Sequence, residues 1–101
     1  MALEVVDNAE RERFEMRDGR KVIGWAAYQE TAELIVFTHT EVDREWEGRG
    51  IGGQLVQATL DHVRRQRMPV LPMCSFVSAW MDRHPDYDDL RYRPPASRVT
   101  D

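Results

Sequence analysis

The sequence has one cysteine, no long apolar run and no excess of basic residues, and each shortage excludes a class of protein. One cysteine cannot form an internal disulfide, so a reducing compartment is the simpler inference. No apolar stretch approaches the roughly 18 residues that a membrane span needs. The first residues also lack the charged and apolar regions of a signal peptide. We therefore expect a cytoplasmic protein with no membrane contact.

Charge and metal-ligand content narrow the function further. A net charge of −4 and a pI near 5.3 argue against a general nucleic-acid binder. The three histidines, His39, His62 and His84, share no ligand spacing, and a lone cysteine is too few for a zinc site. A chain of 101 residues suffices for one domain with one core, so we expect a single domain over 1–101 with a flexible tail from residue 93.

The most informative stretch is residues 45–53, which read EWEGRGIGG. Four of its residues are glycines: Gly48, Gly50, Gly52 and Gly53. Glycine lets a backbone turn at positive φ and approach a ligand closely. A helical pattern starts directly behind these glycines. Because the start of a helix exposes free N–H groups and a partial positive charge, the stretch predicts an anion site, most often one for phosphate.

Three nucleotide-binding patterns compete for this stretch. Gly48 and Gly53 have Walker A spacing, but residues 54–55 are Gln-Leu where that motif needs Lys-Ser or Lys-Thr. Residues 48–53 also satisfy G-x-G-x-x-G, yet residues 68–74 lack the acidic residue that the dinucleotide fold places about 20 residues on. The third pattern is Q/R-x-x-G-x-G/A, the acetyl-CoA loop of the GNAT N-acetyltransferases. Residues 45–50 resemble it at every position but the first, where Glu45 stands.

Local patterns predict the order β-β-β-loop-α-β-α after a short extended N-terminal piece. The expected elements are an extended segment at 3–8, strands at 13–17, 21–29, 33–43 and 70–74, helices at 50–67 and 75–84, and one further turn at 86–90. Asp18-Gly19 is a hairpin turn pattern, Pro72 favours a strand end, and Ser75 is a possible helix N-cap. We expect Phe76, Ala79 and Trp80 on one face of the second helix.

These elements define an α+β fold. Three consecutive strands with short connections predict an antiparallel meander. The strand, loop, helix and strand that follow form a βαβ unit, whose last strand should run parallel to the third by a right-handed crossover.

The same order resembles the second part of the GNAT fold, without the helical segment that most members carry between their first two strands. The chain is similar to a small GNAT-like acetyltransferase family of about this length. The marks of that family are His-Thr-x-Val, Pro-x-Cys-x-Phe/Tyr-Val and His-Pro-x-Tyr. They match residues 39–42, 72–77 and 84–87.

The resemblance implies a cofactor, acetyl-CoA, and an amine acceptor, either a lysine or a small molecule. Backbone amides of the glycine loop would hold the CoA diphosphate, and the backbone near Val42 would bind the pantetheine arm. The acetyl group would lie near Cys74, in a gap between the third and last strands. The residues implied for cofactor binding are Val42, Glu47, Gly48, Arg49, Gly50, Ile51, Gly52 and Gly53.

Four side chains are candidate catalytic groups, and each has an alternative structural role. His39 or Glu41 could act as the base that accepts the amine proton, or they could be a sheet histidine and a solvated carboxylate. Cys74, just before a helix start, could be a nucleophile or a proton donor to the CoA sulfur, or a small buried residue. Tyr87 could protonate the leaving thiolate, as tyrosines do in many GNAT enzymes, or it could serve packing alone.

Three functions remain open at this point. The favoured one is an acetyl-CoA-dependent N-acetyltransferase, as a monomer or a homodimer. The second is a CoA-binding module without catalysis, which the short chain suggests because the missing segment normally forms an acceptor wall. The third is a cysteine-dependent acyl transferase or thioesterase on the same cofactor site.

Overall fold

The computed structural model describes residues 3–94, so most of the predicted C-terminal tail lies outside the described residues. Five strands form one sheet in the order β1-β2-β3-β4-β5. Neighbouring strands from β1 to β4 are antiparallel, and β5 is parallel to β4. The strands are β1 Leu3–Asn8, β2 Arg13–Asp18, β3 Lys21–Glu30, β4 Ile35–Val42 and β5 Val70–Pro72. The helices are α1 Ile51–Gln66 and α2 Ser75–Arg83, with short 3-10 segments at Ala9–Arg11, Arg44–Trp46 and Pro85–Leu90.

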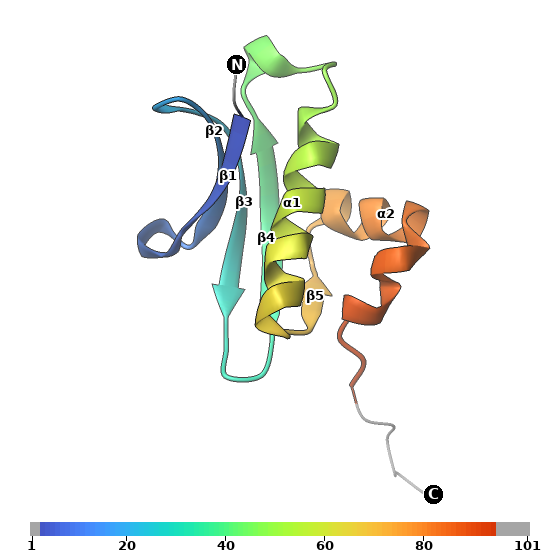
Figure 1. Ribbon diagram of the computed structural model, residues 1–101. Helices are drawn as coiled ribbons and strands as arrows, with labels where there is room; N and C mark the ends of the chain where they lie inside the picture. The colour runs from blue at the N-terminus through green and yellow to red at the C-terminus, as the bar shows by residue number, and fades with distance from the viewer. Residues whose placement is uncertain (1–2, 95–101) are drawn as a thin grey trace, which may run out of the picture.

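This architecture confirms the predicted α+β class, the antiparallel meander and the βαβ unit. Figure 1 shows α1 lying across one face of the sheet and α2 beside β5. Helix α1 buries Leu55, Val56, Leu60 and Val63 in the core it shares with the sheet. These residues recur every three to four positions, so one stripe of the helix faces the strands. Within residues 3–94, no helix combines the length and apolar character that a membrane span requires.

A bulge in β4 changes which side chains face the core. The pairing register with β3 shifts between Ala27 and Tyr28, so that Thr38 is the extra residue. Before the bulge, Ile35 and Phe37 are buried in the core. An extra residue moves the alternation by one position. After it, Thr40 and the other even-numbered residues turn toward the face that α1 covers.

Strand β4 pairs with β5 only over its first three residues. Strand β5 pairs with residues 35–37 of β4, and the Cys74 amide then donates a hydrogen bond to the Phe37 carbonyl at 2.8 Å. The chain turns away into α2 at that point. Among the described residues no strand pairs with the β5-side edge of residues 38–42, so that edge of β4 is open beside the start of α1.

At α2 the predicted N-cap is wrong, and the predicted face holds for Trp80 but not for Phe76. The N-cap is Cys74 rather than Ser75, with no side-chain hydrogen bond to the helix start. The buried face consists of Val77, Trp80 and Met81, while Phe76 is 41% exposed. The backbone hydrogen bond of Cys74 to β4 sets this orientation, because it fixes how the helix leaves the sheet.

A charged cluster lies on the sheet face opposite the core. Glu15 alternates with the core residues Phe14 and Met16, yet it is only 2% exposed. Its carboxylate accepts hydrogen bonds from Arg13 Nε at 2.6 Å, from Arg17 at 2.7 Å and from Asn8 Nδ2 at 3.2 Å. Burial alone would raise the pKa of Glu15, but the hydrogen bonds from Arg17, Arg13 and Asn8 outweigh it and lower that pKa.

Replacing this carboxylate tests its contribution to stability. Glu15→Gln should lower the free energy of unfolding at pH 7 by about 1–3 kcal/mol, since a neutral amide cannot replace charge-assisted hydrogen bonds. The wild-type contribution is complete well above the ordinary value of 4.5 and is lost as the pH falls through the lowered folded-state pKa. Urea unfolding at pH 7 and at pH values below 4.5 should therefore show a difference that narrows with acid. Glu33→Gln, at an exposed position before β4, is the control, and a Glu15→Gln difference independent of pH would contradict the account.

Candidate active site

The loop before α1 turns at two glycines. Asp43 caps the preceding 3-10 segment by accepting a hydrogen bond from the Glu45 amide at 3.1 Å. The chain then passes through Gly48 at φ +78° and Gly50 at φ +74°. In this left-handed region a side chain costs roughly 1–2 kcal/mol, which explains glycine at both positions.

The start of α1 offers four unpaired amides. Gly50 is the N-cap, and the first helical hydrogen bond runs from the Gln54 amide to the Gly50 carbonyl at 3.1 Å. The amides of residues 50–53 therefore precede the helical ladder. Within the described part of the chain, no side chain caps this end, the first turn carries no acidic residue, and no backbone carbonyl accepts from these amides. The partial positive charge of the helix start is thus left for an external anion.

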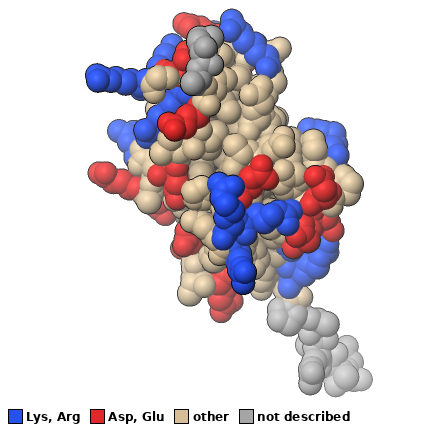
Figure 2. Space-filling view, in the orientation of Figure 1, with Lys and Arg blue, Asp and Glu red and all other residues tan. Residues whose placement is uncertain are grey.

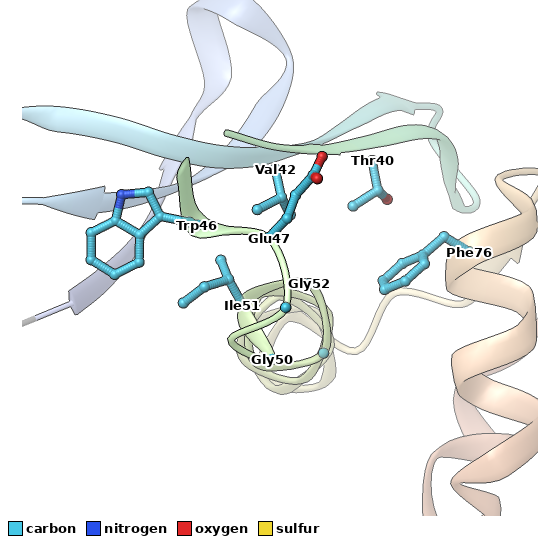
Figure 3. Close-up of a pocket in the computed structure, with 10 residues that line it drawn as sticks. Thr40, Val42, Trp46, Glu47, Gly50, Ile51, Gly52 and Phe76 are labelled. Atoms are coloured by element: carbon cyan, nitrogen blue, oxygen red, sulfur yellow. The ribbon is translucent and has the colours of Figure 1, made fainter. Parts of the chain in front are cut away.

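A cavity of about 330 Å³ adjoins these amides. Its lining residues are Thr40, Val42, Trp46, Glu47, Gly48, Gly50, Ile51, Gly52, Gly53 and Phe76. Figure 3 shows the β4 side chains on one side, the start of α1 on the other, and Trp46 and Phe76 at opposite ends. The cavity therefore lies between the open edge of β4 and the unpaired amides of α1.

The cavity fits a phosphate-bearing ligand with an extended arm. A Cβ added at Gly48 would meet no atom within 4 Å, so the space that a side chain would fill is open. The volume of the cavity, about 330 Å³, lies within the range of small-molecule sites. The open edge of β4 has the backbone donors and acceptors that an amide-containing arm requires. Among the described residues, no group of three potential metal ligands occurs, here or elsewhere.

Seven of the eight residues predicted for cofactor binding line this cavity. The exception is Arg49, whose guanidinium lies over the Trp46 ring, 5.0 Å from its centroid. Glu47 is the one titratable side chain in the lining, and it is exposed. Figure 3 shows its carboxylate extending from the loop toward β4.

His39 and Glu41 do not line the cavity. Their side chains are 60% and 52% exposed, with 3.4 Å between His39 Nε2 and Glu41 Oε1. Because strand residues alternate, they lie on the face opposite Thr40 and Val42. The structure brings these two candidates together, but across β4 from the cavity.

Cys74 lies behind the cavity wall. It is 7% exposed, and its Sγ lies 3.4 Å from Thr40 Oγ1, where either atom can donate. Since Thr40 itself lines the cavity, the thiol is separated from it by one hydroxyl group.

Tyr87 belongs to a different part of the molecule. Its hydroxyl donates to Asp61 Oδ1 at 2.7 Å, and its ring meets Trp80 edge-on. The hydrogen bond to Asp61, and then burial, raise the pKa of Tyr87. Asp61 lies more than two turns along α1 from the cavity, and Tyr87, the predicted proton donor, is not among the residues that line it.

Three residues of the cavity escaped prediction from the sequence: Thr40, Trp46 and Phe76. If the bulge had been known, the alternation of side chains along β4 would have predicted that Thr40 faces the cavity. Phe76 reaches the site only through the packing of α2 on α1. A Cβ on Gly52 would lie 2.8 Å from its ring, so a glycine here lets the ring lie against the helix start.

Comparison with known proteins agrees with this fold. The family model for GCN5-related N-acetyl-transferases matches residues 13–90. A GCN5-like protein from Staphylococcus aureus, solved in solution by NMR, superposes with a TM-score of 0.68 at 22% identity, covering 95% of this chain and 94% of its own. A search of curated proteins finds no match.

A larger enzyme shares the fold more distantly. An aminoglycoside acetyltransferase from an uncultured soil metagenomic sample, in complex with trehalose, superposes with a TM-score of 0.53 at 18% identity. Its complex with sisomicin gives 0.51 at 20%. The matches cover 88% of this chain, but only 64% and 61% of that enzyme.

The burial of Cys74 predicts slow thiol chemistry. Labelling of the folded protein with an aromatic disulfide reagent should be roughly 100-fold slower than labelling in urea, since reagent access requires local opening. Glutathione provides the rate for a free thiol, and Cys74→Ser the background. Equal rates in folded and unfolded protein would mean that the thiol is accessible in the folded protein and would contradict this prediction.

Proposed function

The chain belongs to the GCN5-related N-acetyltransferase family, and we propose on that premise that it binds acetyl-CoA in the cavity beside α1 and transfers the acetyl group to an amine. One observation carries the proposal. The four unpaired amides of residues 50–53 lie beside a cavity whose opposite wall is the open edge of β4.

The amides suit the diphosphate of CoA. A hydrogen bond to a charged group contributes about 1.5–3 kcal/mol, and a helix start adds roughly 0.3–2 kcal/mol for an adjacent anion. No lysine is needed for such binding. Glycine at positions 48, 50, 52 and 53 keeps side chains away from the amides.

The open edge of β4 suits the pantetheine arm. This arm contains two amide groups, which can pair with backbone N–H and C=O groups as an additional strand would. We assign the backbone at Val42 to this role, with the Val42 and Thr40 side chains against the arm. The arm would then lead from the helix start toward the point where β4 and β5 diverge.

Acetyl-CoA, when bound, supplies an activated thioester carbonyl to the reaction. Backbone N–H groups on the open edge of β4 can polarise that carbonyl. Thr40, in the cavity lining, and Cys74, behind it, carry exchangeable protons and are our candidates for protonating the leaving sulfur. His39 and Glu41 remain candidates for accepting the amine proton, because an amine can approach from their sheet face without crossing the cofactor.

A CoA-binding module without catalysis is the second candidate. The observation that favours it is that none of the four predicted catalytic side chains lines the cavity. Such a module would bind acetyl-CoA but would not accelerate release of free CoA in the presence of amines.

Calorimetry with acetyl-CoA tests the binding step. Gly50→Ala should weaken binding by about tenfold, because strain at a positive φ displaces the amides from their positions. Gly19→Ala is the matched control: Gly19 has φ +61° with no atom within 4 Å of an added Cβ, but it lies in the β2–β3 hairpin. It should lose comparable thermal stability and keep its affinity. Equal weakening in both variants, or no binding by the wild type, would contradict the proposal.

The same samples distinguish an enzyme from a module. Free thiol released from acetyl-CoA is followed with and without a panel of primary amines, and faster release with an amine supports transfer. Acetylation of Cys74 detected by mass spectrometry, together with lost turnover in Cys74→Ser, would instead indicate a covalent route through the cysteine.

A further inference from the structure

An aromatic and cationic pair, Trp46 and Arg49, lies at one end of the cavity, and the proposed acetyl transfer assigns it no role. Trp46 lines the cavity, and the Arg49 guanidinium lies over its ring at 5.0 Å. The contact thus connects Trp46, at the end of the 3-10 segment before the glycine loop, with Arg49, between Gly48 and Gly50. We propose that Trp46 and Arg49 bind the 3′-phosphorylated adenosine end of CoA, and that Arg49 discriminates CoA from dephospho-CoA; this inference rests on the proposed function.

The backbone fixes where Arg49 can point. Its two neighbours, Gly48 and Gly50, both have positive φ, and this defines the direction in which the Arg49 side chain leaves the loop. The ring of Trp46 then favours one position of the guanidinium, through a cation–π contact worth about 0.5–1 kcal/mol at an exposed site. This preference lowers the side-chain entropy that is lost when a ligand binds.

The charges around the loop leave Arg49 available. Among the described residues it forms no ion pair. The nearby acids are either paired or lie in the cavity: Asp43 and Glu45 lie near Lys21 Nζ, at 3.7 and 3.6 Å, and Glu47 lines the cavity. A ligand with three phosphate groups would meet repulsion from Glu47, and Arg49 is the cation positioned to offset it.

The position of the pair matches one end of the ligand. Figure 3 shows Trp46 on the side of Gly50 away from Phe76, while the open edge of β4 leads toward Phe76 and α2. If the diphosphate occupies the amides and the pantetheine follows β4, the nucleotide must leave toward Trp46. The amides serve the diphosphate, so a third phosphate requires a side-chain partner, and a planar guanidinium is well suited to it.

Figure 2 shows a group of basic side chains, in blue, over the lower, C-terminal half of α1. This group is an alternative site for the third phosphate. That region includes Arg64, whose guanidinium is already held by Asp89 Oδ2 at 2.7 Å and by the Asp86 carbonyl at 3.0 Å. It also lies near the negative end of α1, which disfavours anions. The loop is therefore the better place for the third phosphate.

Calorimetry of the full chain with CoA and with dephospho-CoA tests the inference. The wild type should bind CoA about tenfold more tightly, because only CoA carries the 3′-phosphate that Arg49 contacts. Arg49→Gln should lose most of that preference, with dephospho-CoA affinity unchanged within about twofold. Arg44→Gln removes the same charge from an exposed position in the adjoining 3-10 segment, and it should retain the preference.

A Trp46→Phe variant tests the platform. It keeps an aromatic ring but offers a weaker face to the guanidinium, so the preference for CoA should fall without disappearing. Quenching of tryptophan fluorescence by CoA should be lost in this variant and kept in Trp25→Phe.

Each outcome is decisive. Equal affinity of the wild type for the two ligands would overturn the inference while leaving the proposed function intact. Equal weakening of both ligands in Arg49→Gln would assign Arg49 to the diphosphate instead. Loss of the preference in Arg44→Gln as well would mean that net charge, not the Trp46–Arg49 pair, is responsible. Binding of neither ligand would overturn this inference and the proposed function together.

Discussion

The site depends on four amide groups to which residues 3–94 offer no hydrogen-bond partner. A helix start is normally completed by a capping side chain or an acidic first turn, and α1 has neither. Instead the N-cap is Gly50, and two of the next three residues are glycines. Without a cap the start of α1 is less stable, but its amides are free to bind an anion. At these residues a capping side chain would raise the stability of the helix and weaken ligand binding.

The second requirement is the early parting of β4 and β5. Pairing with residues 35–37 of β4 suffices to anchor the short β5, and the Cys74–Phe37 hydrogen bond ends the pairing. Together with the bulge at Thr38, this gives β4 an open edge beside α1 and turns Thr40 and Val42 toward the cavity. The same bulge places His39 and Glu41 on the other face, where an acceptor can reach them. The two proposed substrates would thus approach from opposite faces of the sheet and meet where β4 and β5 diverge.

Much of this arrangement could be predicted from the sequence. Periodicity and turn residues located the strands and both helices, because apolar alternation and Asp18-Gly19 are local features. The glycine loop was recognisable because glycine at alternating positions is typical of a backbone that approaches a ligand closely. The predictions for the burial of Phe76 and the cap of α2 were wrong, because both depend on how a helix docks after its strand has ended. The bulge in β4 also has no local sequence pattern, and it alone decides which β4 side chains reach the cavity.

The central claim is that backbone amides at the start of α1 hold the diphosphate, and amide NMR tests it most directly. In ¹⁵N-labelled protein titrated with CoA, the largest shifts should fall on the amides of residues 50–53, with Gly19 and Gly24 as internal references in the same glycine region of the spectrum. Shifts concentrated elsewhere in the chain, with the amides of residues 50–53 unmoved at saturation, would contradict the account.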